Sequence, residues 1–336
     1  MSSADPVRFA IIGLGMGRNR AKLATETEGA ELAVVCSLDE ARARDTAREF
    51  NCDWSTSFAE VVHRDDVDVV GILTPSGTHC RLAVEALQAG KHVFTTKPLD
   101  IQVAVCDQAI AAARAADRLL AVDFGSRYAP LNRRIREAVR SGLLGRVFLA
   151  DLQMKWYRGQ AYYDGGDPPG WRSRRATEGG SLANQGVHYI DLLQWFIGPV
   201  ERVRGRVQTV NHEIETEDCC NALLTFENGC WGVVATTTAS TPNLGTRIEI
   251  SGTGGTISWA NNRLERFVLE EDPEAELEQL LPDPGGPQHI IEDMVSAVRQ
   301  GTAPAVDGPE GRRTVALFEA VYRSAAEDRE VCLAEL

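Results

Sequence analysis

The sequence has no long run of apolar residues and no excess of basic residues. None of its apolar segments approaches the length of a membrane span, and Met1–Pro6 has neither the basic start nor the apolar centre of a secretory signal. The formal net charge of −13 argues against nucleic acid or an anionic membrane as the main partner. We therefore expect a cytoplasmic protein that binds neither nucleic acid nor membranes, with room for a local basic pocket that holds a phosphate.

Eight cysteines are present, but their spacing is not that of metal ligands or of a disulfide framework. The adjacent pair Cys219-Cys220 would point to opposite faces of a strand, which makes it a poor joint ligand. We expect reduced, mostly buried thiols and no metal site. The 336 residues, 43% of them hydrophobic and 25% charged, suffice for two ordinary globular domains.

The order of apolar segments predicts two different domains. Residues 7–125 alternate short apolar strands with helical stretches, which is typical of a doubly wound parallel sheet. From residue 126 a series of strands follows, with the turn Glu227-Asn228-Gly229 between two of them, which indicates an open, largely antiparallel sheet with helices. We expect a dinucleotide-binding Rossmann domain over 1–125 and an α+β domain for substrate and oligomerisation over 126–336. The terminal helices, near 287–300 and 308–326, are expected to pack back on the first domain.

A glycine-rich turn follows the first predicted strand. It reads Gly13-Leu14-Gly15-Met16-Gly17 and precedes an amphipathic stretch. Glycines permit the tight turn and let backbone N–H groups approach a pyrophosphate, while the following helix presents its positive end. Its place between a strand and a helix gives this short pattern its weight. We expect these five residues to bind a dinucleotide.

The end of the second strand bears on the choice of cofactor. An acidic residue at this position usually hydrogen-bonds to the ribose hydroxyls, but this chain has Ser37. A hydroxyl with a nearby arginine suits a 2′-phosphate, and Arg42 and Arg18 are candidates. Asp39 is the alternative reader of an unphosphorylated ribose, although it also suits a helix N-cap. The sequence favours NADP(H) over NAD(H).

Two further loops follow strands of the predicted parallel sheet and therefore face the cofactor crevice. The residues expected to contribute are Thr74, Pro75, His79, Lys97 and Pro98. Proline after Lys97 could aim its ammonium group into the crevice. An ordinary solvated lysine is the alternative.

In the second half, Gly179-Gly180 leads into a helix predicted near 181–196. Asn184 and His188 are four residues apart and would share one face of that helix. A neutral imidazole can take a hydroxyl proton while hydride leaves the same carbon, and an amide can orient the hydroxyl. A buried structural histidine is the alternative, and Asp191 either orients His188 or is structural.

Aromatic and guanidinium side chains suit a polyhydroxylated ligand, and several could reach the same cleft. The candidates are Arg127, Tyr163, Trp171 and Arg172, with structural packing as the alternative for each. The last three lie in the segment 157–180, which is longer than most connections and predicts a lid, a substrate wall or an interface element.

Together these motifs resemble the Gfo/Idh/MocA family of oxidoreductases over nearly the whole chain. The resemblance is carried by the glycine turn, by Thr74-Pro75 with His79, by 86–93 leading to Lys97-Pro98, by Gly179 through Asp191, and by the order of motifs over 290–320. It implies a nicotinamide-dependent enzyme that interconverts a secondary hydroxyl and a ketone on a sugar, sugar derivative or cyclitol. It also implies Lys97 and His188 as the catalytic pair, and a homodimer or homotetramer formed through the second domain's sheet.

The chain departs from the family pattern at three places. The turn is one residue shorter than G-x-G-x-x-G, Thr96 replaces the glutamate before Lys-Pro, and Asn184 stands where aspartate is frequent. The alternatives are physiological reduction of a ketosugar, a non-catalytic dinucleotide-sensing regulator of the same fold, and an enzyme acting on an imine, a dihydrodiol or a pigment. Retention of Lys97 and His188 weighs against the regulator.

Overall fold

The computed structural model describes residues 5–336. The expectation about a secretory signal rests partly on Met1–Ala4, which lie outside the described residues. The chain divides into two compact units. Unit 1 runs to Gly125 and includes Pro287–Arg312, whereas unit 2 comprises Ser126–Gly286 and Arg313–Leu336.

Unit 1 contains a six-stranded sheet in the order β3-β2-β1-β4-β5-β6, and all its neighbouring strands are parallel. The strands are β1 (Val7–Ile12), β2 (Ala30–Cys36), β3 (Asp53–Ser55), β4 (Val69–Ile72), β5 (His92–Thr96) and β6 (Leu120–Asp123). The chain order reverses between β1 and β4, and ligands of such sheets bind where this reversal meets the carboxyl ends of the strands. The predicted doubly wound sheet is confirmed.

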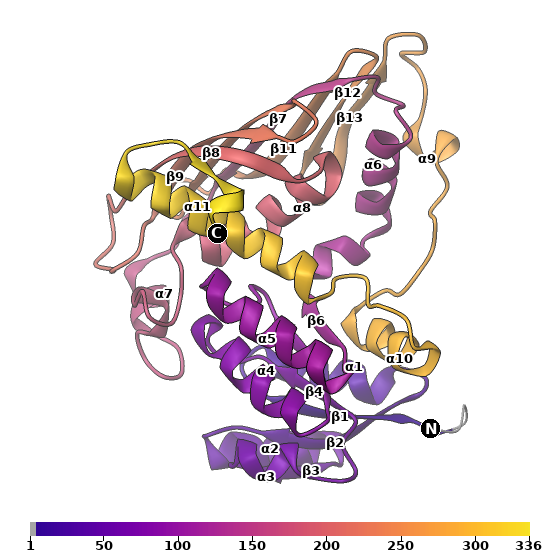
Figure 1. Cartoon of the computed structure of the whole chain (residues 1–336), viewed down its shortest axis with the longest axis vertical. Helices are drawn as coiled ribbons and strands as arrows, with labels where there is room; N and C mark the ends of the chain where they lie inside the picture. The colour runs from indigo at the N-terminus through magenta and orange to yellow at the C-terminus, as the bar shows by residue number, and fades with distance from the viewer. Residues whose placement is uncertain (1–4) are drawn as a thin grey trace. The chain divides into compact units, whose positions relative to one another are not determined.

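Helices cover both faces of this sheet. They are α1 (Gly17–Glu26), α2 (Glu40–Phe50), α3 (Phe58–Val62), α4 (His79–Gln88), α5 (Val103–Ala116) and α10 (Ile290–Gln300). Figure 1 shows α4 and α5 side by side on one face, while α1 and α10 contact each other on the other face. This arrangement buries β1 and β4 on both sides, which is why their sequences are almost continuously apolar.

Unit 2 contains an eight-stranded sheet in the order β13-β12-β11-β7-β10-β9-β8-β14. The strands are β7 (Val147–Lys155), β8 (Val200–Gln208), β9 (Cys219–Phe226), β10 (Trp231–Thr237), β11 (Gly245–Gly252), β12 (Gly255–Ala260), β13 (Arg263–Leu269) and β14 (Val331–Cys332). Only the β7–β10 pair is parallel, so the expected largely antiparallel sheet is confirmed.

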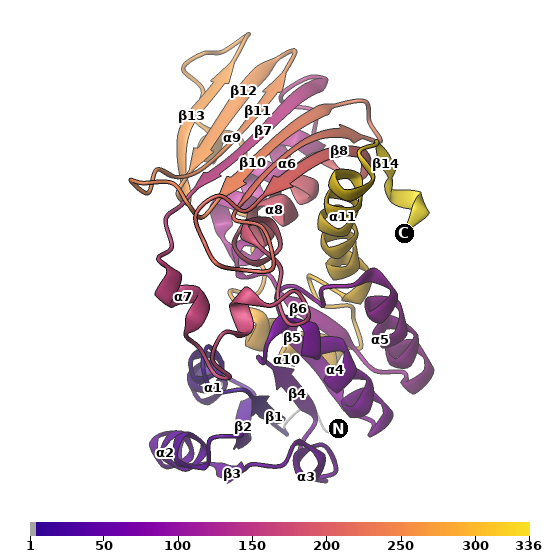
Figure 2. The same cartoon turned by 90° about the vertical axis from the view of Figure 1, so that its left-hand side faces the viewer.

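The main helices of unit 2 lie against one face of its sheet (Figure 2). They are α6 (Pro130–Arg140), α8 (Val187–Ile197) and the part of α11 (Gly308–Glu327) from Arg313 onward. Two shorter helices, α7 (Gln160–Asp164) and α9 (Leu277–Leu280), lie in connecting segments. The opposite face of the sheet carries exposed side chains, which explains the alternating burial along β9 and β10.

The structure corrects the sequence reading in two places. The helix expected over 181–196 begins as a π-helix, η4 (Ser181–Gly186), and becomes α-helical only from Val187. Several short or polar elements were not predicted. The strand β13 is mostly polar and exposed, and each of β3, α3, α7 and α9 has five residues or fewer. Among residues 5–336, no helix has the length and apolar character required to cross a membrane.

Candidate active site

The glycine turn lies at the carboxyl end of β1, and its three glycines differ in their surroundings. Gly13 has φ +87°, and a Cβ atom there would lie 2.6 Å from the carbonyl oxygen of Leu73. Gly15 has nothing within 4 Å of its Cβ position, whereas a Cβ on Gly17 would lie 3.1 Å from Ile11. The first glycine therefore permits the turn, the second leaves space for a ligand, and the third lets α1 pack on β1, which are the three roles that a dinucleotide fingerprint requires.

The end of β2 brings Ser37, Asp39 and Arg42 together. The Ser37 hydroxyl accepts a hydrogen bond from the Asp39 N–H at 3.2 Å, and Asp39 caps α2 by accepting from the Arg42 N–H at 3.0 Å. The Arg42 guanidinium also pairs with the Asp39 carboxylate at 3.4 Å. The expected N-cap role of Asp39 is confirmed. Arg18, the other predicted phosphate partner, pairs with Glu49.

His79 bridges the loops after β4 and β5. Its Nδ1 lies 2.8 Å from the carbonyl oxygen of Pro98 and its Nε2 lies 2.7 Å from that of Thr74. The ring is fully buried, and burial lowers the pKa of His79 while the two carbonyl oxygens favour its protonated form. His79 has no exposed surface and holds the loop that carries Lys97 and Pro98, so its burial corrects the predicted contact with a cofactor.

Asp123 is a buried carboxylate under the influence of Lys97 that sequence reasoning missed. It ends β6 and pairs in register with Thr96 of β5, one residue before Lys97. Its carboxylate binds the Arg20 Nε at 2.7 Å. Burial raises the pKa of Asp123, while the positive charges of Arg20 and Lys97 oppose that rise. The missing glutamate at position 96 therefore does not leave this edge of the sheet without a carboxylate.

In unit 2, Asn184 lies within η4 and the half-buried His188 lies in the first turn of α8. The two residues are four apart along one continuous helical segment, Asn184 in its π-helical turn and His188 just after that turn. The Asn184 amide donates to the Tyr162 hydroxyl at 3.4 Å, and Gln185 donates to the same hydroxyl at 2.6 Å. Tyr162 is thus the aromatic side chain that contacts Asn184.

The aromatic residues of segment 157–180 separate into two environments. Tyr163, the predicted ligand contact, is 2% exposed and bonds to the Thr238 hydroxyl at 2.6 Å, so it belongs to the core. Tyr162 stacks instead against the Arg172 guanidinium. The Cζ atom of Arg172 lies 4.7 Å from the centre of the Tyr162 ring and 4.5 Å from the centre of the Trp171 ring. Neighbouring helical residues point about 100° apart, which follows from 3.6 residues in each turn. The burial of Tyr163 therefore corrects the sequence prediction for this residue, whereas Tyr162 is the tyrosine that contacts Asn184 and Arg172.

Arg127, predicted to bind substrate, forms a buried ion pair with Asp191. Its Nε and Nη2 donate to the two carboxylate oxygens at 2.8 and 2.6 Å, and Thr314 donates to the same carboxylate at 3.0 Å. The exposed fractions of the two side chains are 4% and 0%. This bidentate pair corrects the sequence prediction, because it joins the short turn before α6 to α8 and engages the guanidinium inside unit 2.

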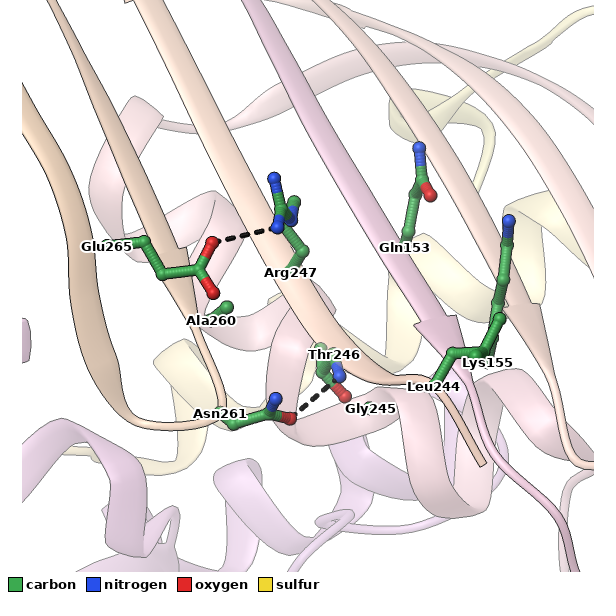
Figure 3. A pocket seen from close by; sticks show the side chains of 9 residues that line it. All are labelled: Gln153, Lys155, Leu244, Gly245, Thr246, Arg247, Ala260, Asn261 and Glu265. Atoms are coloured by element: carbon green, nitrogen blue, oxygen red, sulfur yellow. Dashed lines mark hydrogen bonds and ion pairs between the residues drawn. The ribbon is translucent and has the colours of Figure 1, made fainter. Parts of the chain in front are cut away.

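A polar pocket lies elsewhere, on the exposed face of the unit 2 sheet. Figure 3 shows Lys155 and Gln153 on β7 opposite Arg247 on β11, which pairs with Glu265 at 2.8 Å. None of the predicted site residues, all of which lie within residues 5–336, lines this pocket. In the same described range, no group of three or more His, Cys, Asp or Glu side chains is placed to hold a metal ion.

Two family models match the chain. The oxidoreductase family with an NAD-binding Rossmann fold matches residues 7–124, and the GFO/IDH/MocA C-terminal domain matches residues 132–258. The chain belongs to the GFO/IDH/MocA oxidoreductase family. The predicted family and the prediction of an enzyme are confirmed.

Curated relatives of this family member are dehydrogenases of sugars and cyclitols. D-apiose dehydrogenase of Paraburkholderia graminis is 28% identical, over 97% of this chain and 90% of the relative. Inositol 2-dehydrogenase of Rhizobium meliloti is 25% identical, over 98% of this chain and 99% of the relative. These similarities place the chain among NAD(P)-dependent sugar and cyclitol dehydrogenases at modest identity.

Solved structures of the family agree with the fold. The WlbA dehydrogenase from Chromobacterium violaceum, in complex with NADH and UDP-GlcNAcA, has a TM-score of 0.91 and 28% identity, covering 98% of this chain and 96% of the other. The WlbA dehydrogenase from Bordetella pertussis has a TM-score of 0.89 and 27% identity, covering 98% of each chain. The chain thus has the fold of enzymes that bind a nicotinamide dinucleotide.

Proposed function

We propose that the chain interconverts a secondary hydroxyl and a ketone on a sugar, sugar derivative or cyclitol. The observation that carries the proposal is the glycine turn, in which Gly15 has open space around its Cβ position at the end of β1. A dinucleotide pyrophosphate fits this turn, because the backbone is accessible there and α1 begins at Gly17 with its positive end. The sugar and cyclitol relatives support the class of substrate.

In the proposed reaction the nicotinamide, when bound, accepts a hydride from the substrate carbon or donates one to it. His188 takes the hydroxyl proton during oxidation and returns it during reduction. Lys97 stabilises the developing alkoxide with its ammonium group. Asn184 orients the hydroxyl through its amide, which can position a proton but not accept it as a base.

We infer a polar, hydroxyl-rich substrate from the side chains near Asn184. Tyr162 and Arg172 combine an aromatic face with guanidinium donors, a combination that suits sugar rings better than an apolar pigment. A nucleotide-linked sugar acid is the second candidate. The exposed Arg174 and Arg175 beside this cluster would suit its anionic groups, and UDP-GlcNAcA is bound by the related WlbA dehydrogenase.

Steady-state turnover of inositols, aldoses and UDP-sugar acids with NAD+ and NADP+ tests this proposal. We expect His188→Ala and Lys97→Ala each to reduce kcat by about 100-fold or more while nucleotide binding is retained. Unchanged turnover in His188→Ala would remove that residue from the mechanism. Nucleotide binding without turnover of any substrate in either direction would instead favour the non-catalytic regulator. Faster reduction than oxidation would favour a ketosugar reductase.

We propose NADP(H) as the preferred cofactor, with Ser37 and Arg42 binding its 2′-phosphate. The side chains of Arg42 and Asp39 are 39% and 41% exposed, so replacing the Asp39 carboxylate by a phosphate as the partner of Arg42 would cost little free energy. NADH in the related WlbA structures supports the competing assignment, in which Asp39 reads the ribose.

Asp39→Asn separates these two assignments, because asparagine keeps the N-cap of α2 and removes the charge. If Arg42 reads a phosphate, this variant should bind NADPH more tightly and Arg42→Ala more weakly. If Asp39 reads the ribose, Asp39→Asn should weaken NADH binding and Arg42→Ala should leave it nearly unchanged. Nicotinamide fluorescence titration measures both affinities.

We propose a homodimer or homotetramer formed through the exposed face of the unit 2 sheet. Leu223 on β9 and Trp231 on β10 are 60% and 69% exposed, and Val233 lies opposite Leu223 in register. Apolar patches of this kind mark protein interfaces. Trp231→Glu should yield monomers in light scattering after gel filtration, whereas the control Trp54→Glu on the unit 1 sheet should not. An unchanged mass for Trp231→Glu would exclude this face.

A further inference from the structure

Glu217 is a buried carboxylate that the proposed reaction does not use. It lies two residues before the start of β9, with 4% of its surface exposed. One carboxylate oxygen accepts from the Leu182 N–H at 2.8 Å and from the Tyr322 hydroxyl at 2.9 Å. The other accepts from the Ser181 hydroxyl at 2.6 Å. These three donors thus come from the start of η4 and from α11.

The backbone at the start of η4 is held by the same two side chains. The Tyr322 hydroxyl accepts from the N–H groups of Gly180 and Ala183 at 3.4 and 3.3 Å. The Glu217 carbonyl accepts from the Ser181 N–H at 2.9 Å. A Cβ on Gly180 would lie 2.1 Å from that carbonyl, so only glycine permits this close approach. Helix starts have N–H groups without internal partners, and Glu217 with Tyr322 supplies partners here.

We propose that Glu217 is a positioning residue, which with Tyr322 fixes the start of η4 and thereby the placement of Asn184 and His188. The inference depends on the proposed function in one respect, which is that Asn184 and His188 contact the substrate. A π-helix is held by fewer favourable contacts than an α-helix, so external side chains at its start determine its rotation. A small change of that rotation moves Asn184, which lies inside η4, and His188, which follows in α8.

The network has a second hydrogen-bonding state. Burial raises the pKa of Glu217 to about 7. A protonated carboxyl can donate to the Ser181 hydroxyl, which lies 3.0 Å from the Thr236 hydroxyl and 3.3 Å from the Thr236 carbonyl and can donate onward. Both states therefore keep their hydrogen bonds, but only the ionised state places a negative charge at the start of the helix.

Several other titratable groups lie around Glu217. Burial raises the pKa of Tyr322 from α11, of Cys220 from β9 and of Tyr163 from α7, to about 12 for Tyr163. The buried Glu178 lies two residues before Gly180, and Asp218 pairs with His212 at 2.8 Å. A change near pH 7 in this part of unit 2 is therefore assigned to Glu217 only where Glu217→Gln removes it.

The first test follows the imidazole of His188 by NMR and needs no substrate. The chain has six histidines, and His188→Gln identifies the His188 signal. We expect the His188 signal to show, in addition to any titration of its own imidazole, a step near pH 7 that Glu217→Gln removes and the exposed control Glu213→Gln retains. Glutamine keeps the size of the side chain and the hydrogen bonds of the protonated state. Identical His188 titrations in all three proteins would overturn the proposal.

The second test uses a substrate that the turnover screen identifies. Glu217→Ala should lower kcat by about 10- to 100-fold, as expected for a small misplacement of catalytic groups, with an unchanged affinity for the nucleotide. Glu217→Gln should restore most of kcat and remove the inflection of kcat near pH 7. An unchanged kcat in Glu217→Ala would refute positioning by this side chain, and equal pH profiles in Glu217→Gln and wild type would refute a role for its charge. Absence of turnover in wild type would refute the proposed function, while the NMR result would stand independently.

Discussion

The stability of the chain should depend on pH through Glu217 in a direction opposite to that of most carboxylates. Burial raises the pKa of Glu217 from 4.5 to about 7 in the folded chain. Between these two values the folded chain holds this proton more tightly than the unfolded chain does. The contribution of the protonated group is therefore fully present below pH 4.5, falls as pH rises, and is lost above about pH 7. Each tenfold change in proton affinity is worth about 1.4 kcal/mol, so the loss amounts to about 3 kcal/mol.

Urea unfolding of wild type and Glu217→Gln between pH 4.5 and 8 measures this loss. The glutamine amide can donate to Ser181 and its carbonyl can accept from Leu182 and Tyr322, so the variant resembles the protonated state at every pH. The difference in free energy of unfolding, wild type minus variant, should fall by about 3 kcal/mol across this range. Other buried groups titrate equally in both proteins and cancel from the difference.

Glu213→Gln is the matched control, because it removes an exposed carboxylate from the same segment. Its difference from wild type should stay within about 0.5 kcal/mol at all pH values. Parallel curves for wild type and Glu217→Gln would refute the reasoning, since they would mean that the folded and unfolded chains bind the Glu217 proton equally.

Three further predictions concern unit 1 and the buried ion pairs. Gly13→Ala should destabilise unit 1, because the φ of +87° and a backbone oxygen 2.6 Å from the Cβ position exclude a side chain there. Gly15→Ala should unfold like wild type in urea, because its Cβ position is open, and should lose only nucleotide affinity in a fluorescence titration. Arg127→Met should cost about 3–5 kcal/mol in urea unfolding because it leaves Asp191 charged and buried, and Arg127→Met/Asp191→Leu should recover a large part of that loss. Asp123→Asn should lower the free energy of unfolding by about 2 kcal/mol, less than a fully buried pair because its arginine partner is 21% exposed.

The sequence predicted correctly those features that depend on residues adjacent in the chain. The glycine turn and the apolar strands of unit 1 are patterns of neighbouring residues. Asp39 at the start of α2 has the residue type of an N-cap and is one. Such features depend on a few residues that are adjacent in the chain, so the sequence contains most of the information about them.

The failures have a common physical cause, which is a partner that is distant in the chain. Arg127 pairs with Asp191, 64 residues away, and a guanidinium in a sequence gives no sign of whether its partner is a ligand or a buried carboxylate. The η4 segment looks α-helical because its residues have ordinary helix propensities, and the contacts at its start come from Glu217 and Tyr322. No pattern within 181–196 could have indicated them.

The three departures from the family pattern each have a structural counterpart within one unit. The shorter turn keeps a third glycine, since Gly17 packs against Ile11 where α1 begins. Thr96 is paired in register with Asp123, whose carboxylate is subject to the positive charge of Lys97, and that attraction is mutual. Asn184 lies in a π-helix and contacts Tyr162. A comparison of motifs by position alone counts all three departures as missing residues. In the structure, Gly17 packs α1 against β1 and Asp123 places a carboxylate beside Thr96, so each of the first two departures has a neighbouring residue of the required type.

The third departure is different, because an amide cannot replace a carboxylate as a proton acceptor. If Asn184 contacts substrate, proton removal must therefore fall to His188, and His188→Ala is the variant that should lose the most activity.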